Sequence, residues 1–332
     1  MFMSKILVTG GAGYIGSHVV KLLGKAGHQP VTLDNLSKGR ADAVLYGQLV
    51  VGDTGDRELV TRVLREHGID TVMHFAAFTI VPESVSDPLK YYANNTCSTR
   101  NLLECCVAAG VRNFIFSSTA AVYGMPAAGI CAEDTATSPI NPYGQSKLMS
   151  EYMLRDVCAA HGMRAVILRY FNVAGSDPDG EIGQSTPGST LLTKVAVEAA
   201  LGKRPAVHVY GTDYPTPDGT GVRDYIHVSD LAAAHIDALA YLADGGETVT
   251  LNCGYGHGYS VREVLDTVTR LGPGPFPIIE SPRRAGDPPL LIAKAERIRE
   301  TLGWRPRYDN LEKIVATSLA WEYKLSEMAK AS

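Results

Sequence analysis

The chain of 332 residues has no long apolar run and no large excess of charge of one sign. Because no stretch is long enough to cross the hydrocarbon core of a bilayer, we expect no membrane as a partner. The first residues, Met1 to Lys5, lead directly into a strand-like run, so the sequence predicts no signal peptide. The formal net charge is −4, and without a basic field nucleic acid is not an expected partner.

Cysteine is also scarce. The six cysteines have neither the spacing of metal ligands nor the density of a disulfide scaffold. We therefore expect reduced thiols and a cytoplasmic protein. The nine histidines form no recognisable metal site, and the motif HExxH is absent. The sequence thus predicts no bound metal ion.

A glycine-rich turn near the start of the chain is its most informative feature. The apolar run Ile6 to Val8 precedes Gly10, Gly13 and Gly16, and a helical pattern begins near Tyr14. Glycines at this spacing permit a tight turn, a close approach of the backbone to a pyrophosphate, and packing of the helix on the strand. The start of the helix then offers unpaired N–H groups to the anion. The pattern predicts a dinucleotide site, with a turn that binds no ligand as the alternative.

An acidic residue supports the dinucleotide interpretation. Asp34 closes the short strand-like run Val31 to Leu33, at the distance from Gly16 that is typical of such sites. A carboxylate there accepts hydrogen bonds from the adenosine ribose and repels a 2′-phosphate, so NAD is favoured over NADP. Lys38 and Arg40 follow closely and leave NADP open, should Asp34 turn away.

Strand-like and helical runs alternate through the first half of the chain. The strand-like runs cover residues 5–9, 31–33, 48–51, 71–75, 113–117 and 165–170. Alternation of this kind, with continuous apolar strands, predicts an α/β fold with a doubly wound parallel sheet of the Rossmann type. The length favours two domains. We expect an NAD-binding domain over residues 1–174, to which residues of about 224–250 return, and a smaller α/β nucleotide-sugar-binding domain over residues 175–332.

Tyr143 and Lys147 open a helical pattern that continues to about His161. Their spacing of four places both side chains on one helix face, where the ammonium can stabilise a phenolate and lower the tyrosine pKa from its usual value of about 10. Such a tyrosine can act as a general base. Ser117 to Thr119, at the end of the preceding strand, add hydroxyl groups. Together these residues predict a hydride-transfer site; an ordinary helix surface is the alternative.

These motifs resemble those of the extended short-chain dehydrogenase/reductase family, and within it the sugar-nucleotide 4-epimerases. The resemblance covers nearly the full length. It rests on Gly10 to Ser17, Asp34 to Leu36, Glu83 and Ser84 with Tyr91 to Asn95, Phe116 to Gly124, Pro142 to Lys147, Arg169 to Asn172 and Tyr214 to Asp230. The last of these blocks is the most specific.

The resemblance implies that the substrate is a UDP-hexose, UDP-glucose or UDP-galactose. Tyr143 would take the proton of the 4-hydroxyl while the hydride passes to NAD, and the 4-keto sugar would receive the hydride back on its other face. Lys147 would bind the nicotinamide ribose, and Thr119 the 4-oxygen. The implied cofactor contacts are Gly10, Gly13, Tyr14, Ile15, Gly16, Asp34, Asn35, Asp53, Thr54, Phe75, Ala76, Asn94, Thr119, Tyr143, Lys147 and Phe171.

Two arginines, Arg223 and Arg284, are implied to hold the diphosphate, since guanidinium groups match phosphate oxygens. Asn172 would bind phosphate and Asp287 the uridine ribose.

Three positions depart from the family's pattern. Thr79 stands where a lysine often lies near the cofactor, and Thr190 where an asparagine commonly contacts the substrate phosphate. Leu291 falls at the position that bounds the hexose pocket. Because leucine is bulky, we predict that UDP-glucose and UDP-galactose are preferred over their N-acetylated counterparts.

Two alternatives stay open. Thr119 is followed by Ala120 and Ala121 instead of the acidic pair of the dehydratases of this family, which argues against elimination. A UDP-pentose 4-epimerase, acting on UDP-xylose or UDP-arabinose, is harder to exclude, because a missing hydroxymethyl group costs little selectivity. A non-catalytic NAD-sensing protein is disfavoured by the joint presence of Thr119, Tyr143 and Lys147.

The resemblance also implies a homodimer. The predicted helix from Asp87 to Gly110 and the helix from Tyr143 onward are the two that this family commonly uses to pair subunits. The alternative is that both helices only cover the sheet of their own subunit.

Overall fold

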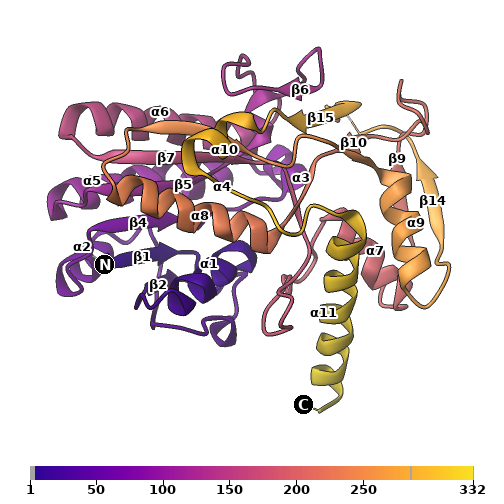
Figure 1. Ribbon diagram of the computed structural model, residues 1–332, viewed down its shortest axis with the longest axis horizontal. Helices are drawn as coiled ribbons and strands as arrows, with labels where there is room; N and C mark the ends of the chain where they lie inside the picture. Colours follow the sequence, from indigo (N-terminus) through magenta and orange to yellow (C-terminus); the bar gives the residue numbers. More distant parts are fainter. Residues whose placement is uncertain (1–3, 285, 332) are drawn as a thin grey trace.

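A computed structural model describes residues 4–284 and 286–331 of the chain. Its centre is a sheet of seven parallel strands in the order β12-β7-β5-β4-β1-β2-β3 (Figure 1). These strands are β1 (Ile6–Thr9), β2 (Val31–Asp34), β3 (Gln48–Val51), β4 (Thr71–His74), β5 (Asn113–Thr119), β7 (Arg164–Tyr170) and β12 (Val249–Cys253). The prediction of a doubly wound parallel sheet is confirmed.

Helices cover both faces of this sheet. On one face α1 (Tyr14–Lys25) packs beside α8 (Val228–Ala243). On the other lie α2 (Arg57–Glu66), α5 (Ser98–Ala109) and α6 (Pro142–His161). The strands are apolar along their length because both faces are buried, which is why continuous apolar runs predicted them.

The long helix expected from Asp87 to Gly110 is interrupted. It consists of α4 (Pro88–Tyr91), a π-helical turn η2 (Tyr92–Cys97) and α5, after the short helix α3 (Val81–Ser86). The wider turn carries Asn95, whose side-chain amide pairs with both backbone groups of Phe78 at 2.9 Å. A π turn of this kind recurs at functional sites.

The rest of the chain forms smaller sheets at the right of Figure 1 and above the main sheet. One has four strands in the order β13 (Tyr259–Ser260), β10 (Val222–Arg223), β15 (Leu290–Ala293) and β6 (Ile130–Cys131). Two pairs are β8 (Asn172–Ala174) with β11 (Tyr225–His227), and β9 (Val207–Tyr210) with β14 (Ile278–Ser281). The helices are α7 (Leu192–Ala200), α9 (Val261–Leu271), α10 (Glu296–Leu302) and α11 (Leu311–Ala331), and short 3₁₀ turns cover Ala41–Ala43 and Ala120–Tyr123.

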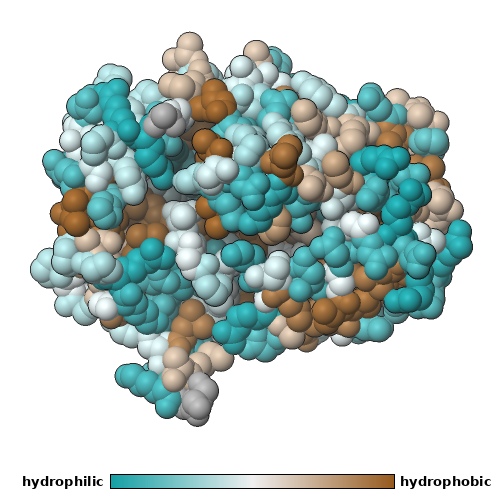
Figure 2. All heavy atoms as spheres, turned by 180° about the vertical axis from the view of Figure 1, so that it is seen from behind, coloured by the Kyte–Doolittle hydropathy of each residue, from teal (hydrophilic) through white to brown (hydrophobic). Residues whose placement is uncertain are grey.

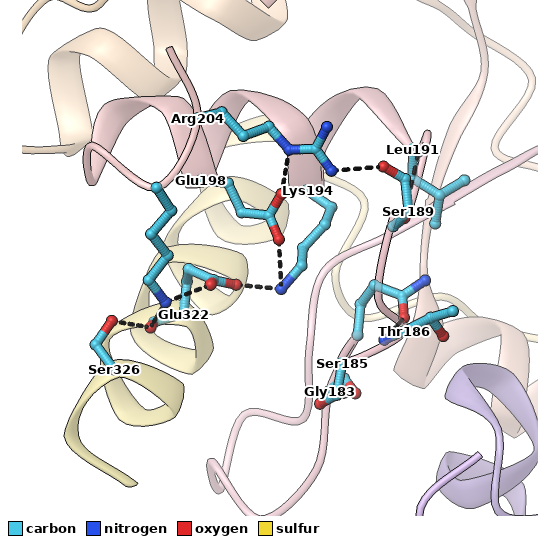
Figure 3. Close-up of polar contacts among 12 residues, drawn as sticks. Gly183, Ser185, Thr186, Ser189, Leu191, Lys194, Glu198, Arg204, Glu322 and Ser326 are labelled. Carbon is cyan, nitrogen blue, oxygen red and sulfur yellow. Dashed lines mark hydrogen bonds and ion pairs between the residues drawn. The ribbon is translucent and has the colours of Figure 1, made fainter. Parts of the chain in front are cut away.

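The end of α11 projects from the body of the molecule in both views (Figures 1 and 2). A polar cluster attaches this helix to α7 (Figure 3). Glu322 pairs with Lys194 and with Lys203, the latter at 2.5 Å, while Arg204 binds Glu198 and donates to the Ser189 carbonyl at 2.9 Å. The loop before α7 is thereby joined to the C-terminal helix.

Among the described helices, none combines the length and the hydropathy that a membrane crossing requires. All six cysteines carry free thiols.

Candidate active site

The glycine turn between β1 and α1 leaves one side of the backbone open. Gly10 has φ +70°, and a Cβ there would meet the backbone N of Ala76 at 2.6 Å. A Cβ on Gly16 would collide with the Gly10 carbonyl, so this glycine permits helix and turn to touch. A Cβ on Gly13 would meet only the Gly10 oxygen, at 3.2 Å. This one contact is closer than an ordinary van der Waals contact, while no other atom of the described residues beyond the turn lies within 4 Å, which leaves the remaining sides of Gly13 free for a ligand.

The N-terminus of α1 is uncapped by side chains. Its N-cap is Gly13, and no acidic residue occurs in its first turn. The Tyr14 side chain points elsewhere, because its hydroxyl donates to the Gly175 carbonyl at 2.6 Å. The backbone N–H groups at Tyr14 and Ile15 and the positive end of the helix dipole are thus available to an anion, which fits the pyrophosphate of NAD.

Asp34 faces the same turn from the end of β2. Its Oδ2 accepts from the Ala12 N–H at 3.0 Å and its Oδ1 from the Leu36 N–H at 2.8 Å. Burial raises the pKa of this carboxyl, while the two hydrogen bonds lower it. Each oxygen retains a lone pair for a ribose hydroxyl. Arg40 pairs with Asp42, its Nε to Oδ1 distance being 2.9 Å, so a 2′-phosphate would meet the Asp34 charge.

Further predicted cofactor residues line the carboxyl ends of the neighbouring strands. Asn35 donates from Nδ2 to Asp53 Oδ2 at 2.8 Å, and Thr54 beside them is buried. Phe75 follows β4, with its ring 4.8 Å from that of His235. Ala76 lies against Gly10, Asn94 is in the π turn, and Phe171 is buried after β7.

Tyr143 and Lys147 stand in the first two turns of α6. This helix begins where Asn141 Oδ1 accepts from the Gly144 N–H at 2.8 Å, followed by a proline that suits the first helical position. Lys147 is buried and donates from Nζ to the Ser117 carbonyl at 2.8 Å. Thr119, at the end of β5, lies near enough to Tyr143 for its hydroxyl to lower the pKa of the tyrosine. Strand and helix thus bring the three predicted catalytic residues together.

The electrostatics differ from what the spacing predicts. Burial raises the pKa of Tyr143, and the hydrogen bond from Thr119 only partly opposes this. Burial lowers the pKa of Lys147 to about 7. The expectation that Lys147 lowers the tyrosine pKa is therefore wrong for the protein without cofactor. Folding removes the phenol of Tyr143 and the ammonium of Lys147 from water, which disfavours the charged form of each. Lys147 donates its hydrogen bond to the Ser117 carbonyl.

A second group of predicted residues gathers on the smaller sheets. Arg223 on β10 lies opposite Leu291 on β15. Arg223 is partly buried, and burial lowers its pKa while the Asp287 carboxylate opposes the shift. Arg284 Nε pairs with Asp287 Oδ2 at 2.7 Å. Asn172 on β8 is the register partner of Tyr225, two residues after Arg223.

One residue that the sequence analysis did not single out belongs with this group. Tyr210 on β9 is 41% exposed, and the Arg284 guanidinium lies 4.8 Å from its ring centroid. An exposed aromatic face next to an arginine suits stacking on a planar base. The alternation of Val207 to Tyr210, which puts His208 and Tyr210 on the open face, was the available signal. Thr190, by contrast, lies exposed in the loop before α7.

Three carboxylates among the described residues are close enough to hold a metal ion: Asp177, Asp179 and Glu181. Lys21 on α1 forms ion pairs with all three, at 2.6, 2.9 and 2.6 Å. Its buried ammonium already supplies the cation, so the group holds the loop after β8 against the cofactor helix.

A doubly wound sheet with a dinucleotide turn and a Tyr–Lys pair beside a strand-end threonine defines an NAD-dependent enzyme of the short-chain dehydrogenase/reductase class. The chain belongs to the NAD dependent epimerase/dehydratase family, whose model matches residues 6–254. The resemblance seen in the sequence and the prediction of NAD as cofactor are both confirmed.

Relatives are similar over nearly their full length. The UDP-glucose 4-epimerase of Azospirillum brasilense is 56% identical over 324 residues, covering 97% of this chain and 93% of that protein. The crystal structure of UDP-glucose 4-epimerase from Brucella ovis in complex with NAD has a TM-score of 0.93 at 45% identity, covering 95% of this chain and 97% of that one. The UDP-Glc/GlcNAc 4-epimerase from Campylobacter jejuni has a TM-score of 0.85 at 47% identity, covering 97% and 99%.

Proposed function

We propose that the protein interconverts UDP-glucose and UDP-galactose by NAD-dependent inversion at carbon 4 through a 4-keto intermediate. The observation that carries the proposal is the convergence of Thr119, Tyr143 and Lys147 at the carboxyl edge of the sheet, next to the open dinucleotide turn. The names of the full-length relatives support the choice of reaction.

In the proposed mechanism Tyr143 Oη accepts the proton of the 4-hydroxyl and later returns it to the 4-oxygen of the inverted sugar. Thr119 Oγ1 hydrogen-bonds that oxygen. When bound, NAD supplies the hydride acceptor and a positively charged ring, which favours the phenolate. Lys147 Nζ adds a second positive charge from the same helix face. The buried position of Lys147 excludes water from this side of the reacting atoms.

The substrate side follows from the residues on the smaller sheets. Arg223 and Arg284 hold the diphosphate with Asn172, and Asp287 binds the uridine ribose. Support comes from the partly buried guanidinium of Arg223 and its nearness to Asp287. For Thr190 the exposed loop position adds no support, so its contact with the phosphate stays a prediction.

The sugar preference is assigned to Leu291. Because Leu291 stands opposite Arg223, a substrate held by that arginine brings its sugar end close to the leucine side chain. A branched side chain at the pocket wall leaves less room for an N-acetyl group. We therefore assign UDP-hexoses without this group as the preferred substrates.

The assembly we propose is a homodimer formed through α3, α4 and α6. These helices pack together and expose apolar side chains: Leu89 is 77% and Val85 63% exposed, and Met149 and Tyr152 are exposed on α6. A second copy would cover this surface. Light scattering should give the mass of two chains, and Leu89→Asp should shift it to one; a single-chain mass for the unmodified protein would contradict the assignment.

The six free thiols support a cytoplasmic location for this protein, since disulfides are rare there. Fractionation of cells that express it tests this assignment directly.

Incubation of the purified protein with UDP-galactose, UDP-xylose and UDP-N-acetylglucosamine separately, without added cofactor, tests the reaction. We expect UDP-glucose from the first, and much slower conversion of the third. Tyr143→Phe should lower kcat by about 100-fold or more. Tyr323→Phe, an exposed tyrosine on α11, serves as the matched control. Conversion of UDP-xylose at the same rate as UDP-galactose would support the alternative of a pentose epimerase. Full activity of Tyr143→Phe would show that Tyr143 is not the base.

A further inference from the structure

Glu151 lies on α6 one helical turn beyond Lys147, and its carboxylate is completely buried. Its Oε1 accepts from Ser118 Oγ at 2.5 Å. Arg169 donates to it twice, from Nε at 3.0 Å and from Nη2 at 2.7 Å, and Arg155 donates from Nη2 at 2.9 Å. The mechanism above does not use this carboxylate, although four hydrogen bonds converge on it.

The contacts of Glu151 join α6 to neighbouring strands. Ser118 on β5 and Arg169 on β7 are direct partners in the register of the parallel sheet. Arg169 also donates from Nη1 to Tyr123 Oη at 2.9 Å, and Tyr123 donates to Asn252 Oδ1 on β12 at 2.6 Å. One carboxylate on the helix is thus connected to the carboxyl ends of three adjacent strands.

Ser118 stands between the two strand residues that contact the catalytic side chains. The Ser117 carbonyl accepts from Lys147, and the Thr119 hydroxyl lies near enough to Tyr143 to lower its pKa. The contacts of Ser117, Ser118 and Thr119 with α6 all depend on the position of the helix along β5. A shift of the helix would therefore separate Tyr143 from Thr119. A bidentate ion pair joined to a hydroxyl is a geometrically restrictive way to set that position.

Glu151 also acts on Lys147 through its charge. Burial lowers the pKa of Lys147, and the Glu151 carboxylate opposes this shift. Other titratable and charged groups on the elements around this part of α6 are His74, Glu83, Lys90, Tyr91, Tyr123, Tyr143, Arg155, Arg169 and Tyr170. Of these, Glu83 already pairs with Lys90 and Tyr91, and burial together with the Lys147 charge holds His74 neutral. Neutralising Glu151 would leave the positive charge of Arg169 unopposed near Lys147.

We propose that Glu151 is a positioning residue of the active site: held by Ser118 and Arg169, its buried carboxylate fixes α6 against β5 so that Tyr143 and Lys147 stay beside Thr119. The inference rests on the function proposed above. Packing of the helix alone does not require the ion pair, because apolar residues of similar volume are often as stabilising as a buried ion pair.

Glu151→Gln keeps the shape of the side chain and removes its charge. We expect kcat for UDP-galactose to fall by about 100-fold, as for other small displacements of reacting groups. KM should change by less than about threefold, because no substrate contact is lost. In the pH profile of kcat the alkaline limb, where Lys147 loses its proton, should move to lower pH. The acid limb, where Tyr143 is protonated, should move to higher pH, since displacement of α6 takes Tyr143 away from the Thr119 hydroxyl, which lowers the tyrosine pKa.

A matched control is Glu322→Gln, which neutralises another buried glutamate that pairs with a lysine, on α11. It should lower thermal stability and leave both limbs of the profile in place. Ser118→Ala removes only the contact to the strand and leaves the ion pair intact. We expect it to fold and to lose about tenfold in kcat at unchanged KM, so it carries the test even if Glu151→Gln does not fold. Glu151→Asp, which restores the charge, should recover the position of the pH limbs.

A readout without turnover is the tyrosinate absorbance of Tyr143, measured against pH as the difference from the same protein carrying Tyr143→Phe. In Glu151→Gln this absorbance should rise at higher pH than in the unmodified protein. A folded Glu151→Gln or Ser118→Ala variant with unchanged titration and kcat within about threefold would overturn the proposal. Failure of the unmodified protein to convert UDP-galactose would instead overturn the proposed function, and the titration would still decide whether Glu151 positions Tyr143.

Discussion

Arg223 and Leu291 are register partners across the parallel strands β10 and β15. The pairing places the guanidinium that we propose for the diphosphate opposite the side chain that we propose for the wall of the sugar pocket. In this proposal, backbone hydrogen bonds of one short sheet set the distance between the two. Specificity and affinity can be tested separately at these two positions.

Leu291→Ala should widen the sugar pocket. We expect the ratio of turnover on UDP-N-acetylglucosamine to that on UDP-galactose to rise by about tenfold or more, because a change of a few methyl groups in a pocket has this effect. Leu290→Ala is the matched control, since the neighbouring leucine packs against Gly129 on the other side of the strand. A ratio that rises equally in both variants would contradict the role of Leu291.

Arg223→Met should weaken binding of the substrate without affecting the cofactor. We expect KM for UDP-galactose to rise by about 30-fold or more, as for loss of a buried charge that pairs with its ligand. Retention of NAD by the purified protein should be unchanged. Arg262→Met, which removes an exposed ion pair with Glu280, is the control. An unaltered KM in the Arg223 variant would remove this residue from the phosphate site.

The central sheet could be predicted because its strands are buried on both faces. Runs such as Ile6 to Val8 are apolar without alternation, and the structure places them within one residue or two of the expected bounds. The strand β12 was not predicted, because its sequence mixes Thr250 and Asn252 with apolar residues. Two-residue strands such as β10 exist only through pairing with distant segments, and no local pattern reports them. The domain boundary after Ala174 stays a prediction.

The candidate site, like the fold, could be predicted from the sequence only in part. The spacing of Tyr143 and Lys147 predicts a shared helix face, and Asn141 with its following proline begins that helix. Spacing cannot report how deeply the two groups are buried, and burial decides the direction of both pKa shifts. Likewise, no pattern around Glu151 indicates its contact with Arg169, which depends on the neighbouring strand.

We infer that the cofactor preference depends on Asp34. Asp34→Ser removes the carboxylate that faces the ribose, so we expect NAD to bind about 10 to 100 times more weakly, as for loss of a hydrogen bond to a charged group. Binding of NADP relative to NAD should increase, because the repulsion of a 2′-phosphate is relieved. Fluorescence titration with both reduced nucleotides measures this. Asp56→Ala, which removes the N-cap of α2, should lower stability and leave the preference unchanged.

The buried histidines cause the free energy of unfolding to decrease as the pH falls. His18 on α1 is buried, and burial lowers its pKa to about 4, while no hydrogen bond to its Nε2 is made by the residues that the structure describes. In the unfolded chain its pKa is near 6.5, so between about pH 6.5 and 4 only the unfolded state binds this proton. The contribution of His18 to the free energy of unfolding is therefore complete above pH 6.5 and declines by about 1.4 kcal/mol per pH unit below it.

His18→Leu removes the titrating ring together with its hydrogen bond to the Tyr14 carbonyl and its edge contact with the Tyr14 ring. Urea unfolding between pH 4 and 7 should show a pH slope that is shallower by about 1.4 kcal/mol per unit than in the unmodified protein. His161→Leu, a change of an exposed histidine at the end of α6, controls for the loss of one imidazole. His74, His227 and His235, whose pKa values burial also lowers, contribute to the slope that remains in His18→Leu. Equal slopes in His18→Leu and the unmodified protein would mean that the imidazole of His18 is protonated, and hence hydrated, in the folded state.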